Sequence, residues 1–248
     1  MNPTIIYGVP FSQPVRAVMW LMLYKQTPFE LVLTNPGSKG DNGSRHPDFL
    51  AKNPAGTIPT MEDPDTGYTL GEAHAIMAYL CNKHGWTDVY PADPEGRGQV
   101  DWYLNYHHRN LRDASVGLVA PKIRKDLDIP EMVQQSAQNT LKAALKALDT
   151  GWLGRGPYLT GENLSIADFA AYVEIGQLQP GFTNVFEFGD YPNVQAWLET
   201  MKQVPGHDEV HVVLAELGDI SVEAPAMETI KNANISALKQ LKASLSEL

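Results

Sequence analysis

The stretch that decides the fold runs from residue 53 to residue 79, in two pieces joined by an acidic turn. Residues 53–60 read Asn-Pro-Ala-Gly-Thr-Ile-Pro-Thr, and residues 71–79 read Gly-Glu-Ala-His-Ala-Ile-Met-Ala-Tyr. The first piece predicts a short apolar strand. Because Pro59 donates no backbone hydrogen bond, it belongs at an edge or in a turn, where the cis form is an option. The second piece predicts a helix. A strand beside a helix N-terminus offers unpaired N–H groups, which suit a carboxylate or an extended peptide.

This stretch resembles the glutathione-binding half of glutathione transferases. In that family the residue before the cis-proline, here Ile58, pairs through its backbone with the cysteine of glutathione. The resemblance therefore implies that Thr57, Ile58 and Pro59 hold the cysteinyl part. It also implies that Glu72 and the backbone N–H of Ala73 hold the γ-glutamyl end. The other interpretation of the same residues is a β-hairpin followed by a helix in any α/β protein.

The composition limits the class of protein. With 248 residues, 43% of them hydrophobic, the chain can bury the core of one large or two modest domains. A formal net charge of −10 opposes non-specific binding to nucleic acid and to anionic membranes. One cysteine, Cys81, suits a reducing compartment, and the first residues show neither a secretory signal nor a transmembrane run. We therefore expect a cytoplasmic protein with no nucleic-acid or membrane partner.

The first 84 residues alternate strand and helix patterns. The order is strand, helix, strand, and then helix, two strands and helix, which predicts an α/β, thioredoxin-like domain over residues 1–84. The predicted strands cover residues 4–7, 29–33, 57–61 and 68–70, and the predicted helices cover residues 12–25, 47–52 and 72–84.

Strand patterns nearly stop after a predicted linker at residues 85–93. Helical periodicity then marks residues 94–117, 131–151, 165–178, 192–204 and 207–217. We therefore expect an all-α domain over residues 94–220.

Residues 221–248 form a separate C-terminal extension. An apolar stripe between lysines predicts a helix there, and the stripe consists of Ile230, Ile235, Leu238, Leu241 and Leu245. Three interpretations stay open, namely a docked helix, a partner-binding helix and a partly mobile tail.

A second motif lies at residues 163–169, which read Asn-Leu-Ser-Ile-Ala-Asp-Phe. Ser165 and Asp168 have the spacing of a capping box, and such a cap stabilises a helix by about 1–2 kcal/mol. The surrounding pattern also resembles one that recurs in the all-helical domain of glutathione transferases. The resemblance thus extends over residues 4–217.

Residues 11–18, Phe-Ser-Gln-Pro-Val-Arg-Ala-Val, resemble the pattern of theta-type transferases, in which the serine donates to the glutathione sulfur. The resemblance makes Ser12 the catalytic residue. A free thiol has a pKa of about 8.5, so a hydroxyl donor at a helix N-terminus would favour the reactive thiolate. Two alternatives remain: Ser12 only caps its helix, or Tyr7 contacts the thiol, as a tyrosine does in other classes. No cysteine lies near this turn, which opposes thioredoxin-type chemistry.

Other expectations for glutathione follow from the same resemblance. Gln13 is a candidate for contact with the glutathione backbone. Arg45 is the preferred ligand of the glycine carboxylate, with Lys39 and His46 as alternatives. The family usually has Ser or Thr after the acidic residue that opens the helix, but this chain has Ala73. The missing hydroxyl would weaken binding by about 1.5–3 kcal/mol unless another donor replaces it.

The second substrate is expected between the domains, against the helix that starts near residue 94. Phe11, Tyr106 and Arg112 are the candidates for this electrophile pocket. The adjacent His107 and His108 could suggest a metal, but no Glu or Cys completes a ligand set. We therefore expect no metal site.

These observations together predict a theta-like glutathione transferase active in detoxification, with glutathione as co-substrate and no other cofactor. Its second substrate would be a small hydrophobic electrophile such as an alkyl or aryl halide, an epoxide or a peroxide, and the family implies a homodimer. A weakly catalytic, glutathione-binding regulatory protein on the same fold is one alternative. A second alternative is a specialised glutathione-dependent lyase, dehalogenase or isomerase. A third, for which the sequence gives the least support, is a translation-associated module that uses the fold to dock partners.

Overall fold

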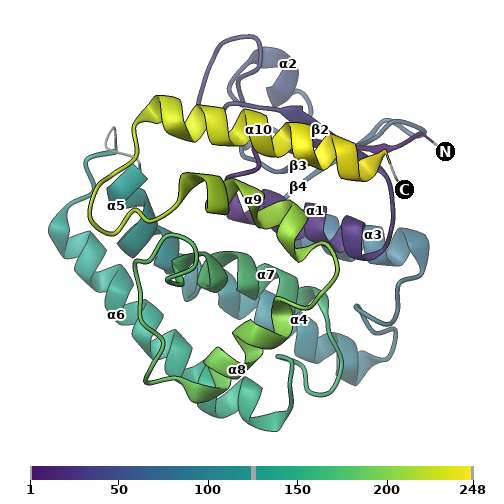
Figure 1. Cartoon of the computed structure of the whole chain (residues 1–248). Coiled ribbons are helices and arrows are strands. Elements are labelled where there is room, and N and C mark those ends of the chain that lie inside the picture. Colours follow the sequence, from purple (N-terminus) through teal and green to yellow (C-terminus); the bar gives the residue numbers. More distant parts are fainter. Residues whose placement is uncertain (1, 124–126, 247–248) are drawn as a thin grey trace.

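The N-terminal part of the computed structural model contains a four-stranded mixed sheet. The structure describes residues 2–123 and 127–246 (Figure 1). The sheet order is β2-β1-β3-β4, with β1 parallel to β2 and antiparallel to β3, and β3 antiparallel to β4. This arrangement confirms the predicted thioredoxin-like fold. The elements are β1 (Thr4–Gly8), α1 (Gln13–Tyr24), β2 (Phe29–Leu33), α2 (Pro47–Leu50), β3 (Thr60–Asp63), β4 (Tyr68–Gly71) and α3 (Ala73–His84).

The described residues after α3 form only helices and their connections, apart from one isolated bridge between Tyr158 and Gly161. The helices are α4 (Pro94–Arg109), α5 (Ala120–Ile123), α6 (Glu131–Ala147), α7 (Ile166–Ile175), α8 (Pro192–Met201), α9 (His207–Leu217) and α10 (Met227–Leu245). π-Helical turns occupy Ser115–Val119 and Leu148–Trp152. The all-α character predicted for this half is confirmed. The division of the chain at residues 84 and 94 coincides with the end of α3 and the start of α4, and as a domain boundary it stays a prediction.

Helix α1 lies at the centre of the molecule, where it contacts α3, α7 and α9. Ten of its twelve residues are buried, so it is apolar on nearly every side. The ring of Trp20 packs against Phe169 and Tyr172, with centroids 5.0 and 5.2 Å apart, and its Nε1 donates to the Pro205 carbonyl at 2.9 Å. Contacts of this kind between the halves fix the position of the α1 N-terminus, where Ser12 lies.

Helix α7 is buried along its whole length and begins at the predicted capping box, which the structure confirms. The Asp168 carboxylate accepts from the Ser165 N–H at 2.9 Å and from the Ser165 hydroxyl at 3.0 Å. It also accepts from the Leu159 N–H at 2.8 Å and from Trp197 Nε1 at 3.0 Å. Burial raises the pKa of Asp168 to about 6, against the opposing effect of these donors. One side chain thus joins three segments of the helical half.

Two predicted elements differ from the structure. The helix predicted for residues 94–117 ends at Arg109, because the backbone of Asn110 leaves helical geometry and its side chain donates to the Tyr106 carbonyl at 2.7 Å. The strand predicted for residues 57–61 begins only at Thr60, after the cis Ile58–Pro59 bond. Residues 57–59 therefore run free of the sheet.

Helix α10, in the C-terminal extension, packs along α9 (Figure 1). Its buried positions are Ala233, Ala237 and Leu241. The predicted apolar stripe is wrong at Ile235, which is 50% exposed. Glu216 of α9 accepts from two polar side chains of α10, Ser236 at 2.5 Å and Gln240 at 2.7 Å.

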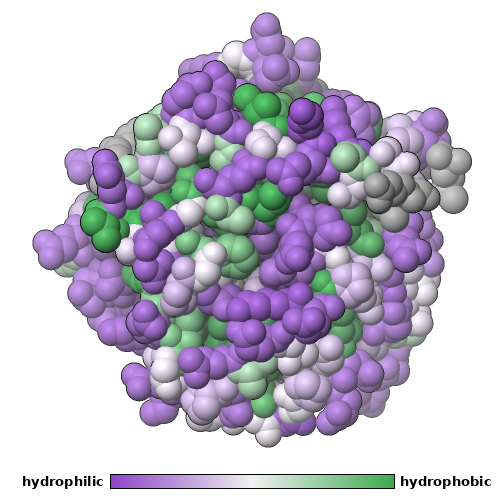
Figure 2. Space-filling model, viewed as in Figure 1, coloured by the Kyte–Doolittle hydropathy of each residue, from purple (hydrophilic) through white to green (hydrophobic). Residues whose placement is uncertain are grey.

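The face of the molecule that carries α10 is mostly hydrophilic, with smaller hydrophobic patches between the polar side chains (Figure 2). None of the helices in residues 2–123 and 127–246 is long and apolar enough to cross a membrane.

Candidate active site

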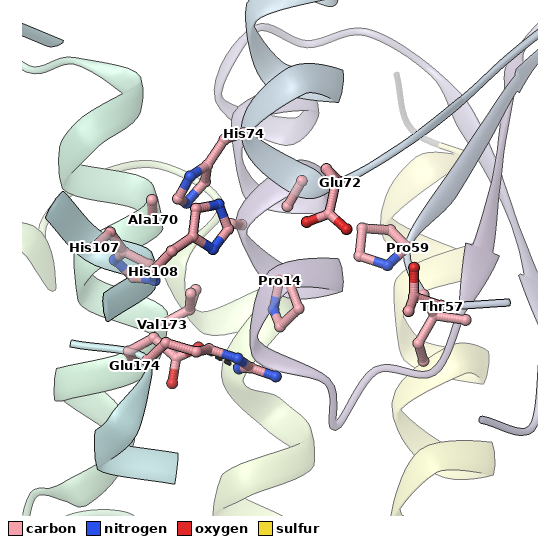
Figure 3. Close-up of a pocket in the computed structure, with 14 residues that line it drawn as sticks. Pro14, Thr57, Pro59, Glu72, His74, His107, His108, Ala170, Val173 and Glu174 are labelled. Atoms are coloured by element: carbon pink, nitrogen blue, oxygen red, sulfur yellow. Dashed lines mark hydrogen bonds and ion pairs between the residues drawn. The ribbon is translucent and has the colours of Figure 1, made fainter. Parts of the chain in front are cut away.

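A pocket of about 170 Å³ lies between the sheet-containing half and the helical half (Figure 3). In the close-up, His74, His107 and His108 lie at one side of the pocket and Thr57, Pro59 and Glu72 at the other. The pocket is lined by Pro14, Ala17, Thr57, Ile58, Pro59, Glu72, Ala73, His74, His107, His108, Arg112, Ala170, Val173 and Glu174. Five separate segments of the chain therefore build it.

The segment before β3 is fixed from behind by a buried asparagine. Asn53 Nδ2 donates to the Thr57 carbonyl at 3.1 Å and to Thr60 Oγ1 at 2.9 Å. The peptide bond between Ile58 and Pro59 is cis. Among the described residues, the backbone N–H and C=O of Ile58 make no hydrogen bond. An extended peptide can therefore pair with Ile58 at this edge of the pocket.

The N-terminus of α3 forms the neighbouring wall. Glu72 precedes the helix with φ 66° and ψ 115°, a backbone conformation that is rare for a residue with a side chain. Its side chain makes no capping bond, so the first N–H groups of α3 keep their positive end open to the pocket. Ala73 lines the pocket and is 6% exposed. This wall can hold a carboxylate.

Ser12 precedes α1, and its side chain does not cap the helix. Its backbone N–H donates to the Val9 carbonyl at 3.0 Å, and its carbonyl accepts from the Arg16 N–H at 2.9 Å. The hydroxyl has no hydrogen-bond partner within the described residues. The structure thus gives no support to the alternative that Ser12 is only a cap. Ser12 itself is not among the lining residues, but Pro14, two residues further on, is.

Tyr7, the other candidate for contact with the thiol, has its hydroxyl engaged in the sheet. It donates to Glu62 Oε2 at 2.6 Å, and Lys52 Nζ reaches the same oxygen at 2.6 Å. Burial, followed by the bond to Glu62, raises the pKa of Tyr7. Tyr7 does not line the pocket.

A buried polar network lies beneath the pocket, where α1 meets α7 and the turn that follows α4. Arg112 forms an ion pair with Glu174, which is almost fully buried. Arg112 Nη1 also lies 3.4 Å from Gln13 Oε1, and Gln13 Nε2 donates to Gln177 Oε1 at 3.0 Å. The attraction of Glu174 raises the pKa of Arg112. Arg112 therefore lines the pocket as a cation, whereas Gln13 is buried beside it.

The imidazoles of His74, His107 and His108 form a cluster on the wall of the pocket. The ring centroid of His74 lies 4.9 Å from that of His107 and 4.5 Å from that of His108. Burial lowers the pKa of His74 to about 2 and that of His107 to about 3. Both are thus neutral near pH 7. No group of three or more His, Cys, Asp or Glu residues in the described part of the chain could hold a metal ion.

The remaining predicted site residues lie around the pocket rather than in its wall. Arg45 is exposed, and its Nη1 lies 3.0 Å from the point where a Cβ on Gly56 would stand, next to Thr57. Phe11 is buried, and Tyr106 packs on Trp152 with ring centroids 4.9 Å apart. Neither Phe11 nor Tyr106 lines the pocket.

Sequence reasoning did not assign His74 or Glu174 to the site. His74 shares the wall with the histidine pair of α4 because its ring packs on both of theirs, a contact between two distant parts of the sequence. Glu174 had a visible signal, since it is one of two acidic residues in the mostly apolar run Ile166–Ile175, and the other, Asp168, belongs to the capping box. A buried acid of this kind requires a partner, which Arg112 provides.

Comparison with known proteins relates both halves of the chain to one family. Residues 6–92 match the family model of the glutathione S-transferase N-terminal domain, and residues 110–205 match that of the C-terminal domain. Human glutathione S-transferase theta-1 is 32% identical over 228 residues, which cover 89% of this chain and 91% of that protein. Glutathione S-transferase T3 of Arabidopsis thaliana is 30% identical, but the match spans 37% of its length and 86% of this chain.

The solved structures show the same relationship. The apo form of human glutathione S-transferase T1-1 superposes with a TM-score of 0.73 at 25% identity, over 96% of this chain and 99% of that one. The sheet order, the cis-proline segment and the matches over both halves agree with one another, and the chain belongs to the glutathione S-transferase family.

Proposed function

We propose that this protein conjugates glutathione to small electrophiles, with Ser12 as the residue that stabilises the thiolate. The single observation that carries the proposal is the unpartnered Ser12 hydroxyl at the N-terminus of α1. A hydroxyl in that place can donate to a sulfur anion, and the helix dipole favours the same charge. Each unit by which the thiol pKa falls corresponds to about 1.4 kcal/mol of preferential thiolate stabilisation.

The peptide part of glutathione would lie across the sheet end of the pocket. The free backbone groups of Ile58 would pair with the cysteinyl residue. Glu72 and the N–H of Ala73 would hold the γ-glutamyl end at the start of α3. Arg45, exposed beside Gly56, is placed to reach the glycine carboxylate.

The reaction would be a nucleophilic displacement. The thiol proton leaves to water, the thiolate attacks the electrophilic carbon, the carbon–sulfur bond forms, and the halide leaves with the electron pair of the broken bond. The cation Arg112, the neutral imidazole of His107 and the ring of His108 form the opposite wall. That wall would contact the electrophile, and Arg112 would favour charge developing on the leaving group.

The test compares the Ser12→Ala variant with the wild-type protein in the conjugation of a chlorodinitrobenzene and of an alkyl halide. We expect the variant to lose at least about tenfold in kcat, because one charge-assisted hydrogen bond to the thiolate is removed. Glutathione affinity, measured by calorimetry, should change little. Ser136→Ala, an exposed serine on α6, is the matched control. Equal, uncatalysed rates for wild type and Ser12→Ala, with glutathione still bound, would contradict the proposal.

Such a result would instead favour a glutathione-binding regulatory protein on the same fold, an alternative that the alanine at position 73 supports. A narrow profile in a screen of halides, epoxides and peroxides would favour a specialised lyase or dehalogenase.

We also propose that the protein acts as a homodimer in the cytoplasm, as its family implies. Trp102 on α4 and Tyr68 on β4, which are 50% and 45% exposed, are large apolar side chains that a second copy would cover. Analytical ultracentrifugation at micromolar concentration should give twice the mass of one chain.

A further inference from the structure

Phe11, the residue before Ser12, has both of its backbone polar groups bound by side chains, one of them from the distant helix α10. The Phe11 N–H donates to Asn234 Oδ1 of α10 at 2.8 Å. The Phe11 carbonyl accepts from Arg16 Nη1 at 2.6 Å. Arg16 is itself fully buried, and its Nη2 donates to the Val173 carbonyl at 3.1 Å. The two bonds fix the backbone that leads into Ser12.

The carboxamide of Asn234 is oriented before it meets Phe11. Its Nδ2 donates to the Ile230 carbonyl, one turn back in α10, at 2.9 Å. Only this orientation lets the nitrogen donate and leaves the oxygen to accept from the Phe11 N–H. The neighbouring positions Ala233 and Ala237 are buried, which holds this face of α10 against the protein.

The direction of the Ser12 hydroxyl depends on its backbone, because its side chain has no hydrogen-bond partner within the described residues to orient it. The peptide between Phe11 and Ser12 is bound at both of its polar groups, because the Ser12 N–H donates to the Val9 carbonyl and the Phe11 carbonyl accepts from Arg16 Nη1. Without the Asn234 bond, Phe11 is held only through its carbonyl, and the Pro10–Phe11 peptide loses the partner of its N–H. A catalytic hydroxyl loses efficiency when its position changes by about an ångström.

We propose that Asn234 is a positioning residue, which holds the Phe11–Ser12 turn so that the Ser12 hydroxyl points at the thiolate. The inference rests on the proposed function of Ser12. It makes α10 part of the catalytic apparatus, although α10 contributes none of the residues that line the pocket.

The experiment is a double-mutant cycle between Asn234→Ala and Ser12→Ala in the full chain. Two readouts apply, the kcat of halide conjugation and the pKa of bound glutathione, which ultraviolet absorbance of the thiolate reports. We expect Asn234→Ala to lower kcat about fivefold and to raise the thiol pKa by about half a unit, as the loss of one neutral hydrogen bond implies. In the Ser12→Ala background the same change should alter kcat by no more than about twofold and should leave the thiol pKa unchanged, because Asn234 acts only through Ser12.

Alanine is the best helix former, so α10 keeps its helix in the variant, and thermal unfolding should show this. Asn232→Ala is the matched control, since Asn232 is an exposed asparagine on the same helix. A merely structural role would reduce kcat equally in both backgrounds and leave the thiol pKa unchanged, and this result would overturn the inference. So would a wild-type kcat and thiol pKa in Asn234→Ala. If Ser12→Ala alone has no effect, it is the proposed function that fails.

Discussion

Ala73 lacks the side-chain hydroxyl that could bind a carboxylate at this site. It is buried at the start of α3, where the first N–H groups of the helix are open to the pocket. The family usually has a hydroxyl there, which would add a hydrogen bond to the carboxylate of the γ-glutamyl end. The backbone supplies the positive helix end, but the side chain supplies nothing polar.

Restoring that hydroxyl should strengthen binding. We expect Ala73→Ser to lower the Kd of glutathione about tenfold, because a hydrogen bond to a charged group contributes about 1.5 kcal/mol or more. Isothermal titration calorimetry measures the change. Ala75→Ser, on the exposed side of the same helix, is the control and should leave the Kd unaltered. An unchanged Kd for Ala73→Ser would mean that the γ-glutamyl carboxylate lies elsewhere.

Residues of the site differ in how far the sequence could predict them. Ile58, Pro59 and Glu72 belong to one continuous motif, whose resemblance to the glutathione-binding half of the family was enough to predict them for the site, and all three line the pocket. His74 and Glu174 belong to helices that meet only through tertiary packing. Which face of α3 meets α4 depends on how the two halves dock, and periodicity within one helix carries no such information.

The helices also differ in how well the sequence predicted where they end. Helix α9 has the bounds that its pattern predicts, His207–Leu217, since Gly206 and Gly218 border it. The end of α4 was predicted eight residues too late, because the side-chain bond of Asn110 to the preceding turn competes with the helix. A competing side-chain bond of this kind does not change the spacing of the apolar residues, so the hydrophobic period does not reveal where the helix ends.

Helix α7 depends on the four hydrogen bonds of Asp168. Asp168→Asn keeps the size of the side chain but leaves only one accepting oxygen, so two of the donors, such as the Leu159 N–H and Trp197 Nε1, would face an amide nitrogen. We expect a loss of about 2–4 kcal/mol in the free energy of unfolding, the order of two unsatisfied buried donors. Urea unfolding followed by circular dichroism measures it. Asp41→Asn, in an exposed loop, should stay within about 0.5 kcal/mol of wild type. A change of similarly small size in Asp168→Asn would show that the capping box of Ser165 and Asp168 does not stabilise the fold.

At the scale of the whole molecule, part-buried hydrogen bonds join segments that are far apart in the sequence. Trp20 of α1 reaches Pro205 of the helical half, and Asn234 of α10 reaches Phe11 of the other. The composition predicted that two units could form, and the motifs predicted their folds. Contacts that span 185 and 223 residues have no local signature, so the place of α10 could come only from the structure.

The histidines between the halves make the stability of the whole molecule depend on pH. His107 is 4% exposed, and burial lowers its pKa to about 3, while His74, His108 and Arg112 face it or lie beside it. The unfolded chain binds a proton at this residue below about pH 6.5, whereas the folded protein does not. Stability is therefore complete above that pH and falls as the pH drops. The loss at pH 5 is about 2 kcal/mol for His107 alone.

The measurement is the free energy of unfolding in urea at pH 7.5 and at pH 5.0, for the wild type and for His107→Gln. Asp168, whose pKa is raised to about 6, has the opposite sign, because the folded protein binds its proton more tightly than the unfolded chain does. The comparison with the variant removes that contribution, since Asp168 is present in both proteins. His107→Gln should lose about 2 kcal/mol less than the wild type between the two pH values. An equal loss in both proteins would show that His107 takes up a proton in the folded state, and that the interface between the halves admits water at this position.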